Sequence, residues 1–232
     1  MCVSLVIVNW NGKHFLSECL EGLRGQRYRS FEIIVVDNGS DDGSVDFIKH
    51  RYSEVNVIAL SQNLGFAAAN NLAIRTVKSK YIALLNNDAV PDHLWLETLV
   101  DVMDRHPEAG FAASKMVFEK DRETIDRAGD AYTTAGAALL RGRGEPVDKF
   151  DNEEWVFGAC AGAALYRTEM FRDIGLFDED FFILCEDVDL SFRAQLKGYR
   201  CHYTPEAVVY HERSGSIVHD SPLSVYYGHR NL

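Results

Sequence analysis

The sequence predicts an α/β fold built on a mostly parallel central sheet. Between residues 4 and 105, short apolar runs alternate four times with segments whose apolar residues have helical spacing. Glycine and small polar residues separate the two members of each pair. Consecutive β-α units of this kind form a doubly wound parallel sheet, because each helix returns the chain to the same edge and covers one face.

Each unit can be placed along the chain. The first pairs the apolar run Ser4–Val8 with a helix that begins near Phe15. The second pairs the β-rich run Phe31–Val36 with a helix that begins near Val45, across a polar loop. For the remaining two units we expect strands at 55–60 and 81–85, and helices at 66–77 and 93–105.

The regular alternation ends after Arg105. The glycine-rich segment 119–151 predicts extended loops or short antiparallel strands that form a mobile lid. The run 155–166 is rich in small residues, which favours either close approach of a ligand or a strand packed tightly under a helix. Helical spacing returns near Glu186 and continues to Gly198. We expect one domain over 1–232, made of the halves 1–106 and 107–232.

Composition limits the possible functions. The chain has 232 residues, of which 47% are hydrophobic and 25% charged, as in a globular domain with a proper core. A formal net charge of -11 argues against nucleic-acid binding, which needs clustered Lys and Arg. Five widely spaced cysteines, with no Cys-x-x-Cys pair, predict reduced thiols. The absence of a signal peptide or an apolar span from the sequence predicts a cytoplasmic protein.

Polar residues follow the predicted strands where a parallel sheet binds ligands. Asn9, Asp37, Asn63 and Asp88 each lie at or just after a strand end. Any one of them is explained as a helix cap or turn residue, but four at one edge favour a binding site. Because the chain is acidic, a phosphate ligand would need a cation, and a carboxylate at the mouth of a strand suits Mg2+ or Mn2+.

A second acidic cluster lies between residues 178 and 189. Carboxylates at a helix N-terminus stabilise the helix dipole, which accounts for some of this cluster. Their number exceeds that role, because so many like charges are costly unless a cation or a proton uses them.

The motifs together resemble glycosyltransferase family 2, in its rhamnosyltransferase-like branch. They are Val8-Asn9-Trp10-Asn11-Gly12, Val36–Ser44, Asn63–Phe66 with Asn70, Asn86-Asn87-Asp88, Phe177-Asp178, Glu186–Asp189, and Tyr210–Ser216. The resemblance implies a GT-A fold, a Rossmann-like mostly parallel sheet with a smaller antiparallel acceptor-side region. It also implies a nucleotide-diphosphate sugar donor, a divalent metal and inversion at the anomeric carbon.

The resemblance implies a role for each matching residue. Asp187 corresponds to the catalytic base, and Asp88 and His211 to the metal or diphosphate site. The usual first aspartate of the Asp-x-Asp motif is Asn86 here, which predicts weaker metal binding. The nucleotide-sugar set, in half 1–106, is Val8, Asn9, Asn11, Asp37, Asn63, Gly65, Asn70, Asn86 and Asn87. The acceptor side, in half 107–232, is expected to include Trp155, Gly162 and Glu186.

The resemblance also implies the partners. The favoured donors are dTDP-rhamnose or a UDP-sugar, and the acceptor is a lipid-linked or cell-envelope glycan at the inner face of the membrane. Because the Gln-x-x-Arg-Trp segment of processive members is missing from the sequence, one sugar is expected per encounter. The end of the chain, Tyr226–Leu232, resembles an element that precedes an amphipathic region in relatives, so we expect the natural protein to continue and to contact the membrane peripherally there.

Other interpretations remain open on the sequence. A nucleotidyltransferase would share the sheet and the metal but should have a glycine-rich basic loop, whereas Asn9–Lys13 has one glycine. A nicotinamide-dependent oxidoreductase would need a Gly-x-Gly-x-x-Gly turn, which the sequence lacks after the first strand. A sugar-nucleotide-binding module without turnover is the third alternative, and the presence of Asp88 and Asp187 argues against it.

Overall fold

A computed structural model describes residues 2–212 and 221–231. Their strands form a ten-stranded sheet and a separate two-stranded hairpin. The helices are α1 (Lys13–Arg24), α2 (Ser44–Arg51), α3 (Phe66–Ile74), α4 (Trp95–Arg105), α5 (Thr168–Ile174), α6 (Glu186–Leu196) and α7 (Pro222–Arg230), with the 3-10 turns η1 (Val147–Phe150) and η2 (Glu179–Phe181). The strands are β1 (Val3–Asn9), β2 (Phe31–Asp37), β3 (Val55–Ala59), β4 (Tyr81–Leu85), β5 (Ala89–Pro91), β6 (Ala109–Phe118), β7 (Asp121–Ala128), β8 (Asp130–Tyr132), β9 (Ala138–Leu140), β10 (Glu154–Val156), β11 (Ala163–Arg167) and β12 (Arg200–His211).

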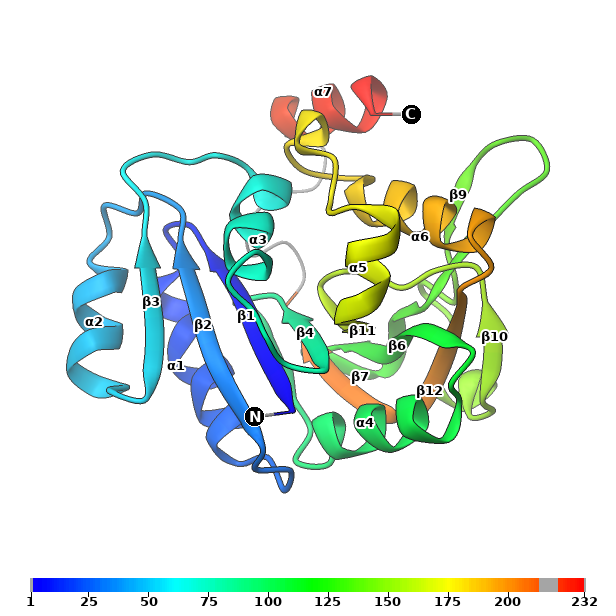
Figure 1. The fold of residues 1–232 in the computed structure, drawn as a ribbon, viewed down its shortest axis with the longest axis horizontal. Coiled ribbons are helices and arrows are strands. Elements are labelled where there is room, and N and C mark those ends of the chain that lie inside the picture. Colours follow the sequence, from blue (N-terminus) through cyan, green and yellow to red (C-terminus); the bar gives the residue numbers. More distant parts are fainter. Residues whose placement is uncertain (1, 213–220, 232) are drawn as a thin grey trace.

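The sheet runs through both halves of the chain in the order β10-β12-β6-β11-β4-β1-β2-β3 (Figure 1). The strands β4, β1, β2 and β3 are parallel to one another, as the β-α units predict. Antiparallel β11 lies between β4 and β6 and joins the two halves. Beyond it, β6 and β12 are again parallel, β5 and β10 pair with β12, and β7 pairs with β6. The hairpin consists of β8 and β9.

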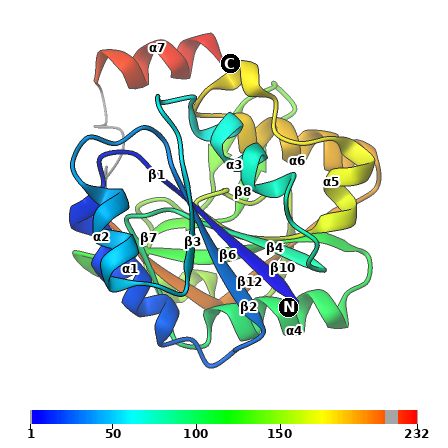
Figure 2. The same cartoon turned by 60° about the vertical axis from the view of Figure 1, so that its left-hand side comes forward.

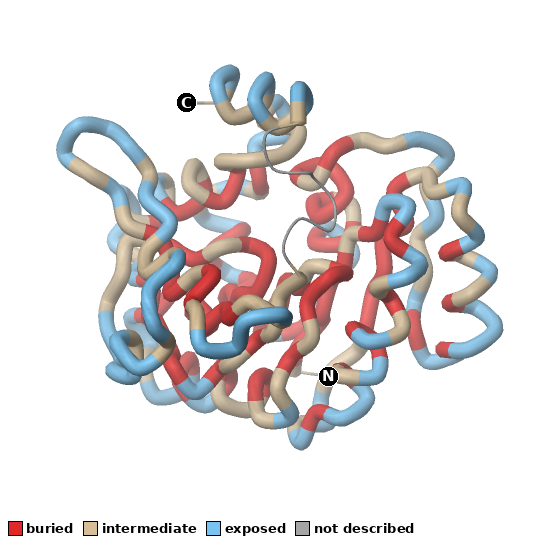
Figure 3. Tube along the Cα trace, turned by 180° about the vertical axis from the view of Figure 1, so that it is seen from behind, coloured by how far each residue is buried: buried red, intermediate tan, exposed pale blue. Residues whose placement is uncertain are grey.

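Alternating side chains of the sheet build two hydrophobic cores, because successive strand residues point to opposite faces. Val3, Leu5 and Ile7 of β1 pack in one core with the apolar faces of α1, α2 and α4. Val6 packs in the other core, with residues of α3, α5 and α6. Figure 2 shows these two groups of helices on opposite sides of the sheet, and Figure 3 shows the strands between them as the most buried part of the chain.

Several element boundaries differ from the sequence prediction. The helix expected over 66–77 ends at Ile74, because Thr76 and Val77 donate to carbonyls three residues back instead of four. The helix expected over 93–105 begins at Trp95, after a turn in which Asp92 accepts from the backbone of Leu94. The prediction missed β5, a three-residue strand that follows Asp88 and pairs with the end of β12.

For the segment 119–151 the sequence left open extended loops or short antiparallel strands. The structure shows short antiparallel strands there, namely β7, β8 and β9. The apolar run 155–166 divides into the end of β10 and most of β11, with a loop between them. The helix expected from residue 186 is α6, and it has Glu186 and Asp187 in its first turn.

Candidate active site

The carboxyl ends of β1, β2 and β4 bring the predicted polar residues together. Asn9 and Asp37 are partners in the parallel register of β1 and β2. The Asn9 amide donates to Asp37 Oδ2 at 2.9 Å, and the Asn87 amide donates to Asn9 Oδ1 at 2.8 Å. Val8, one residue earlier in β1, is half-buried. These amide hydrogen bonds connect the ends of β1, β2 and β4, so this edge of the sheet is rigid before any ligand binds.

The next loops hold the remaining residues of the predicted nucleotide-sugar set. Asn11 Oδ1 accepts from the backbone of Asp41 at 2.9 Å, and Asp37 Oδ1 accepts from the backbone of Ser40 at 3.0 Å. Asn63 Oδ1 accepts from the backbone of Gly65 at 2.8 Å, and Asn70 donates to the carbonyl of Phe66 at 2.9 Å. These bonds fix the backbone of both loops.

Gly65, the residue just before α3, is in tight contact with Phe182. Its φ of +87° is a conformation that side chains disfavour, and a Cβ there would lie 2.6 Å from the carbonyl oxygen of Phe182. That same oxygen accepts from the backbone of Phe66 at 2.6 Å. Gly65 therefore lets the segment before α6 cap the N-terminus of α3.

Asp88, His211 and Asp126 form a buried chain. His211 Nδ1 lies 2.7 Å from Asp126 Oδ2, and His211 Nε2 lies 3.3 Å from Asp88 Oδ1. The second pair is not aligned for a hydrogen bond, so Asp88 Oδ1 and His211 Nε2 have no hydrogen-bond partner among the described residues. A carboxylate on one imidazole nitrogen, with the other nitrogen facing a second carboxylate, is the arrangement of a metal-ligating histidine. The donor atoms therefore fit a divalent cation.

Neighbouring charges set the protonation of this chain. Burial favours a neutral imidazole, but the bond to Asp126 and the closeness of Asp88 outweigh burial and raise the pKa of His211 to about 9. Burial likewise opposes ionisation of Asp126, yet the His211 bond and the charges of His211, Arg143 and Arg127 hold the pKa of Asp126 below its usual range. Without a cation the imidazolium supplies the compensating positive charge, and metal binding at His211 Nε2 would release that proton.

Glu186 and Asp187 lie side by side in the first turn of α6, and both are buried. Asp187 Oδ2 accepts from the backbone of Ala161 at 3.2 Å, and Oδ1 accepts from the backbone of Val188 at 2.9 Å. Burial, and then the charge of Asp187, raise the pKa of Glu186 to about 8, so Glu186 is mostly protonated at neutral pH. The two carboxyl groups therefore play different electrostatic roles.

Gly162 connects Asp187 with the Asn86–Asp88 motif. The carbonyl of Gly162 accepts from the backbone of Asn86 at 2.8 Å, and a Cβ on Gly162 would lie 2.8 Å from the Asn86 amide. Because Ala161, the neighbour of Gly162, donates to Asp187, a short stretch of backbone separates the two motifs. The backbone of Ala161 and Gly162 thus connects Asp187 with Asn86, two residues before the predicted metal ligand Asp88.

Arg127 lies among the carboxyl groups near Asp187. It follows Asp126 in β7 and is half-buried, with Nη1 3.0 Å from Asp130 Oδ1. Despite burial, the nearby charges of Cys160, Asp130, Asp187 and Asp126 raise the pKa of Arg127 above its usual value. Burial raises the pKa of Asp130 to about 6, with Arg127 opposing and Asp187 reinforcing the shift. Arg127 is therefore a fixed cation among these carboxyl groups.

The prediction missed Asp126, Arg127 and Asp130. All three lie in the segment whose secondary structure the sequence left open. Their signal was the charged pair Asp126-Arg127 directly after Ile125, which is itself fully buried in β7. Only the pairing of β7 with β6 shows that these charges face the interior.

The loop that leads into α6 has an unusual backbone. Phe182, Leu184 and Cys185 have φ values of +62°, +71° and +71°, a region that residues with side chains seldom occupy. The amide of Asn231, just after α7, donates to the carbonyls of Phe181, Ile183 and Leu184 at 2.7–3.0 Å. The end of the described chain thereby holds the loop that positions Asp187.

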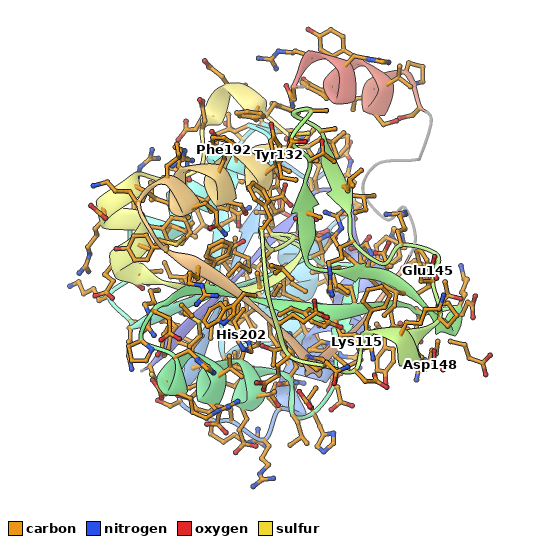
Figure 4. The ribbon with its side chains drawn as sticks, turned by 90° about the vertical axis from the view of Figure 1, so that its right-hand side faces the viewer. Lys115, Tyr132, Glu145, Asp148, Phe192 and His202 are labelled. Carbon is orange, nitrogen blue, oxygen red and sulfur yellow. The ribbon has the colours of Figure 1, made fainter. Side chains whose placement is uncertain are left out.

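A pocket of about 210 Å3 lies beside this loop, between the β8–β9 hairpin, α6 and Asn231. Cys185 and Val188, on either side of the Glu186-Asp187 pair, line it. The rings of Tyr132 and Phe192 also line it, with their centroids 5.4 Å apart (Figure 4). The pocket offers apolar and aromatic surface next to the predicted base.

Trp155 lies elsewhere. It is in β10, opposite His202 at the beginning of β12, whereas His211 is at the end of β12. In the register against β6, His202 is opposite Ala112 and His211 opposite Phe118, so about 20 Å of strand separates those ends. Among the predicted residues, the structure groups those of β1, β2 and β4 with His211, Gly162, Glu186 and Asp187, and separates Trp155 from them. The end of the predicted motif Tyr210–Ser216, from residue 213, lies outside the described residues, as does Leu232.

Comparisons with known proteins show what this chain resembles. A sequence model of the family described as "Glycosyl transferase family 2" matches residues 4–175. The chain is 26% identical over 248 residues to the N-acetylglucosaminyl-diphospho-decaprenol L-rhamnosyltransferase of Mycobacterium tuberculosis, covering 93% of this chain and 78% of that protein. It is 27% identical over 225 residues to the O-antigen biosynthesis protein RfbC of Myxococcus xanthus, covering 92% of this chain but 17% of that protein.

Among solved structures, that of GalNAc-T7 with UDP, GalNAc and Mn2+ superposes with a TM-score of 0.75. The sequence identity is 18%, over 92% of this chain and 44% of that one, so the likeness concerns the fold. Within residues 2–212 and 221–231, every helix is too short or too polar to cross a bilayer.

Proposed function

This chain belongs to glycosyltransferase family 2, and we propose that it is an inverting, metal-dependent enzyme that adds one sugar per encounter. The sugar would come from a nucleotide-diphosphate donor and go to a hydroxyl of a glycan acceptor. The observation that carries the proposal is the pair of buried atoms Asp88 Oδ1 and His211 Nε2, which lack hydrogen-bond partners among the described residues. The backbone contacts of Asn86 with Gly162, and of Ala161 with Asp187, connect this pair to the proposed base.

Asp88 and His211 would hold Mg2+ or Mn2+, with Asp126 orienting the imidazole. When bound, such a cation supplies positive charge that stabilises the departing diphosphate. The Asn9, Asn87 and Asp37 network keeps the ends of β1, β2 and β4 in place beside it. Asn86 stands where the Asp-x-Asp motif usually has its first aspartate. Its side-chain amide lies next to Gly162.

Asp187 would act as general base. Its carboxylate accepts the proton of the acceptor hydroxyl while that oxygen forms a bond to the anomeric carbon of the donor sugar. The bond from that carbon to the diphosphate oxygen breaks on the opposite face, so the configuration inverts. The backbone bonds from Ala161 and Val188 orient the carboxylate. Protonated Glu186 avoids a second negative charge at the same place.

For the donor we propose dTDP-rhamnose or a UDP-sugar. The names of rhamnosyltransferase relatives and the UDP in the GalNAc-T7 structure support these two classes. Asp37, at the end of β2, would accept from the ring NH of a pyrimidine base. For the acceptor we propose a lipid-linked or cell-envelope glycan, and the diphospho-decaprenol in the name of the Mycobacterium tuberculosis relative supports the lipid-linked class. We further propose that the acceptor is reached at the cytoplasmic face of the membrane.

Donor hydrolysis tests the proposal without a known acceptor. The chain is incubated with dTDP-rhamnose, UDP-sugars or GDP-sugars, with Mn2+ or with a chelator, and the released nucleotide is measured. We expect slow hydrolysis of one donor class that requires Mn2+ and is abolished in Asp88→Ala. Hydrolysis that is equally fast with chelator, or in Asp88→Ala, would contradict the metal role. Binding of every donor without turnover would contradict the transfer reaction.

A further inference from the structure

A second group of metal-ligating side chains lies far from the candidate active site. It consists of His106 just after α4, Glu153 just before β10, and His202 near the beginning of β12. One donor atom from each lies within 4.8 Å of the others. Figure 4 shows His202 beside α4, well away from Tyr132 and Phe192. No step of the proposed transfer reaction uses these residues.

Each imidazole of this group already has a partner for one nitrogen. His202 Nδ1 lies 3.3 Å from Thr204 Oγ1, and His202 Nε2 faces Glu153 Oε2 at 3.7 Å. His106 Nδ1 lies 3.2 Å from Glu108 Oε1. The two rings stack with their centroids 4.7 Å apart. The oxygen beside Nδ1 of His202 leaves Nε2 toward Glu153, and metal-ligating histidines are commonly held by an oxygen in this way.

The surroundings suit a cation. Arg105 pairs with Oε1 of Glu153 at 3.2 Å, which leaves Oε2 toward His202. Trp155 packs edge-on against both imidazoles and shields them from one side.

We propose that His106, Glu153 and His202 form a second divalent-metal site, which takes Zn2+ in preference to Mg2+. Two imidazoles and one carboxylate are ligands for a transition metal, whereas Mg2+ prefers oxygen. In tetrahedral Zn2+ sites the ligand atoms lie about 3.3 Å apart, so closure needs side-chain movements on the order of 1 Å. Glu153 is exposed and His106 half-exposed, so both can move. A bound ion would tie α4 and β12 to the short edge strand β10.

Zinc titration of the full chain tests this site. Calorimetry is run in excess Mg2+, in the wild type and in an Asp88→Asn background that removes a ligand of the first site. We expect one equivalent of Zn2+ to bind in both, and binding to weaken at least about tenfold in Glu153→Gln and in His106→Gln. Zn2+ should also raise the melting temperature of the wild type but not of these variants.

Matched controls use neighbouring residues of the same type. Glu154→Gln removes the adjacent carboxylate, which pairs with Arg141, and His93→Gln removes an exposed histidine that pairs with Asp92. Both should bind Zn2+ as the wild type does. Zinc affinity unchanged in Glu153→Gln and His106→Gln would overturn the proposal, as would the failure of the wild type to bind Zn2+. Loss of binding in Asp88→Asn alone would assign the ion to the first site and overturn it too.

Discussion

The two halves of the chain hold their buried polar residues in different ways. In residues 2–106 the side chains bond to one another, as Asn9 does to Asp37 and Asn38 does to Asn63. In residues 107–231 the buried polar residues are mostly titratable, and several of their oxygens lack hydrogen-bond partners among the described residues. These oxygens are Glu119 Oε2, Asp126 Oδ1, Asp130 Oδ2, Tyr166 Oη and Glu186 Oε2.

This difference assigns the two halves different tasks. A buried polar atom without a partner costs about 1–3 kcal/mol, so a stable protein retains several together only where something else uses them. The first half supplies a preformed frame, and the second supplies groups that can exchange a proton or a cation. Asp88 is the exception, because it belongs to the first half and faces the charged residues of the second.

Asp187→Asn should have the largest effect. Removing the base is expected to lower the transfer rate about 10²–10⁴-fold while the folded structure is kept, because the amide oxygen can still accept from Ala161. Steady-state kinetics with donor and acceptor, together with a melting curve, measure both quantities. Asp180→Asn, an exposed member of the same acidic segment, is the control and should retain activity. Equal losses in both variants would show that the charge of the segment, and not one base, matters.

Asp126→Asn should weaken metal binding next. Asp126 orients His211, and loss of such a partner typically costs about 10–100-fold in metal affinity. Mn2+ titration followed by electron paramagnetic resonance measures the free ion directly. Asp121→Asn changes an exposed carboxylate of the same strand, which bonds to Thr124, and should leave the affinity unchanged. If Asp126→Asn bound Mn2+ with wild-type affinity, the result would contradict a metal-binding role for His211 oriented by Asp126.

Glu186→Gln should change how stability depends on pH. The folded-state pKa of Glu186, about 8, lies above the value of 4.5 expected in the unfolded chain. Its contribution to stability is therefore complete below pH 4.5 and is lost as the pH rises to 8. At pH 8 the Gln variant should exceed the wild type by about 4 kcal/mol, measured by urea denaturation. Glu169→Gln, in exposed surface on α5, should follow the wild-type curve.

Asn87→Ala should have the smallest of these effects, since it removes one neutral bond from the frame. Asn9 Oδ1 would lose its donor, and we expect the free energy of unfolding to fall by about 1 kcal/mol. Urea denaturation measures the loss, provided that the slope of the unfolding free energy against urea concentration is unchanged. Asn56→Ala, at an exposed position on β3, is the control. A loss in Asn87→Ala no larger than in the control would mean that the frame is not stabilised by its amides.

The sequence predicted the first half well because its signals are local. Apolar runs and helical spacing located β1 to β4 and their helices, and the motif order predicted the GT-A fold and the family, both of which the comparisons confirm. Boundaries depended on single hydrogen bonds, as at Ile74 and Trp95, which periodicity does not encode.

The second half was harder to predict because its site depends on pairing between distant segments. Asp126 and His211 are 85 residues apart in sequence. They become partners only because β7 pairs with β6 and β6 pairs with β12. Trp155, the first residue of the apolar run 155–166, was expected on the acceptor side. The register of β10 against β12 instead places it at the opposite end of β12.

The left-handed backbone before α6 has a consequence for how this chain can be shortened. Phe182, Leu184 and Cys185 adopt conformations that cost energy for residues with side chains. The amide of Asn231, which bonds to carbonyls of this loop from 47 to 50 positions later in the chain, offsets that cost. A protein that ended before Asn231 would retain every residue of the catalytic motifs. It would nevertheless lose the contact that holds the loop before α6. Any loss of activity in such a protein would reflect a relaxed loop and not a missing reactive group.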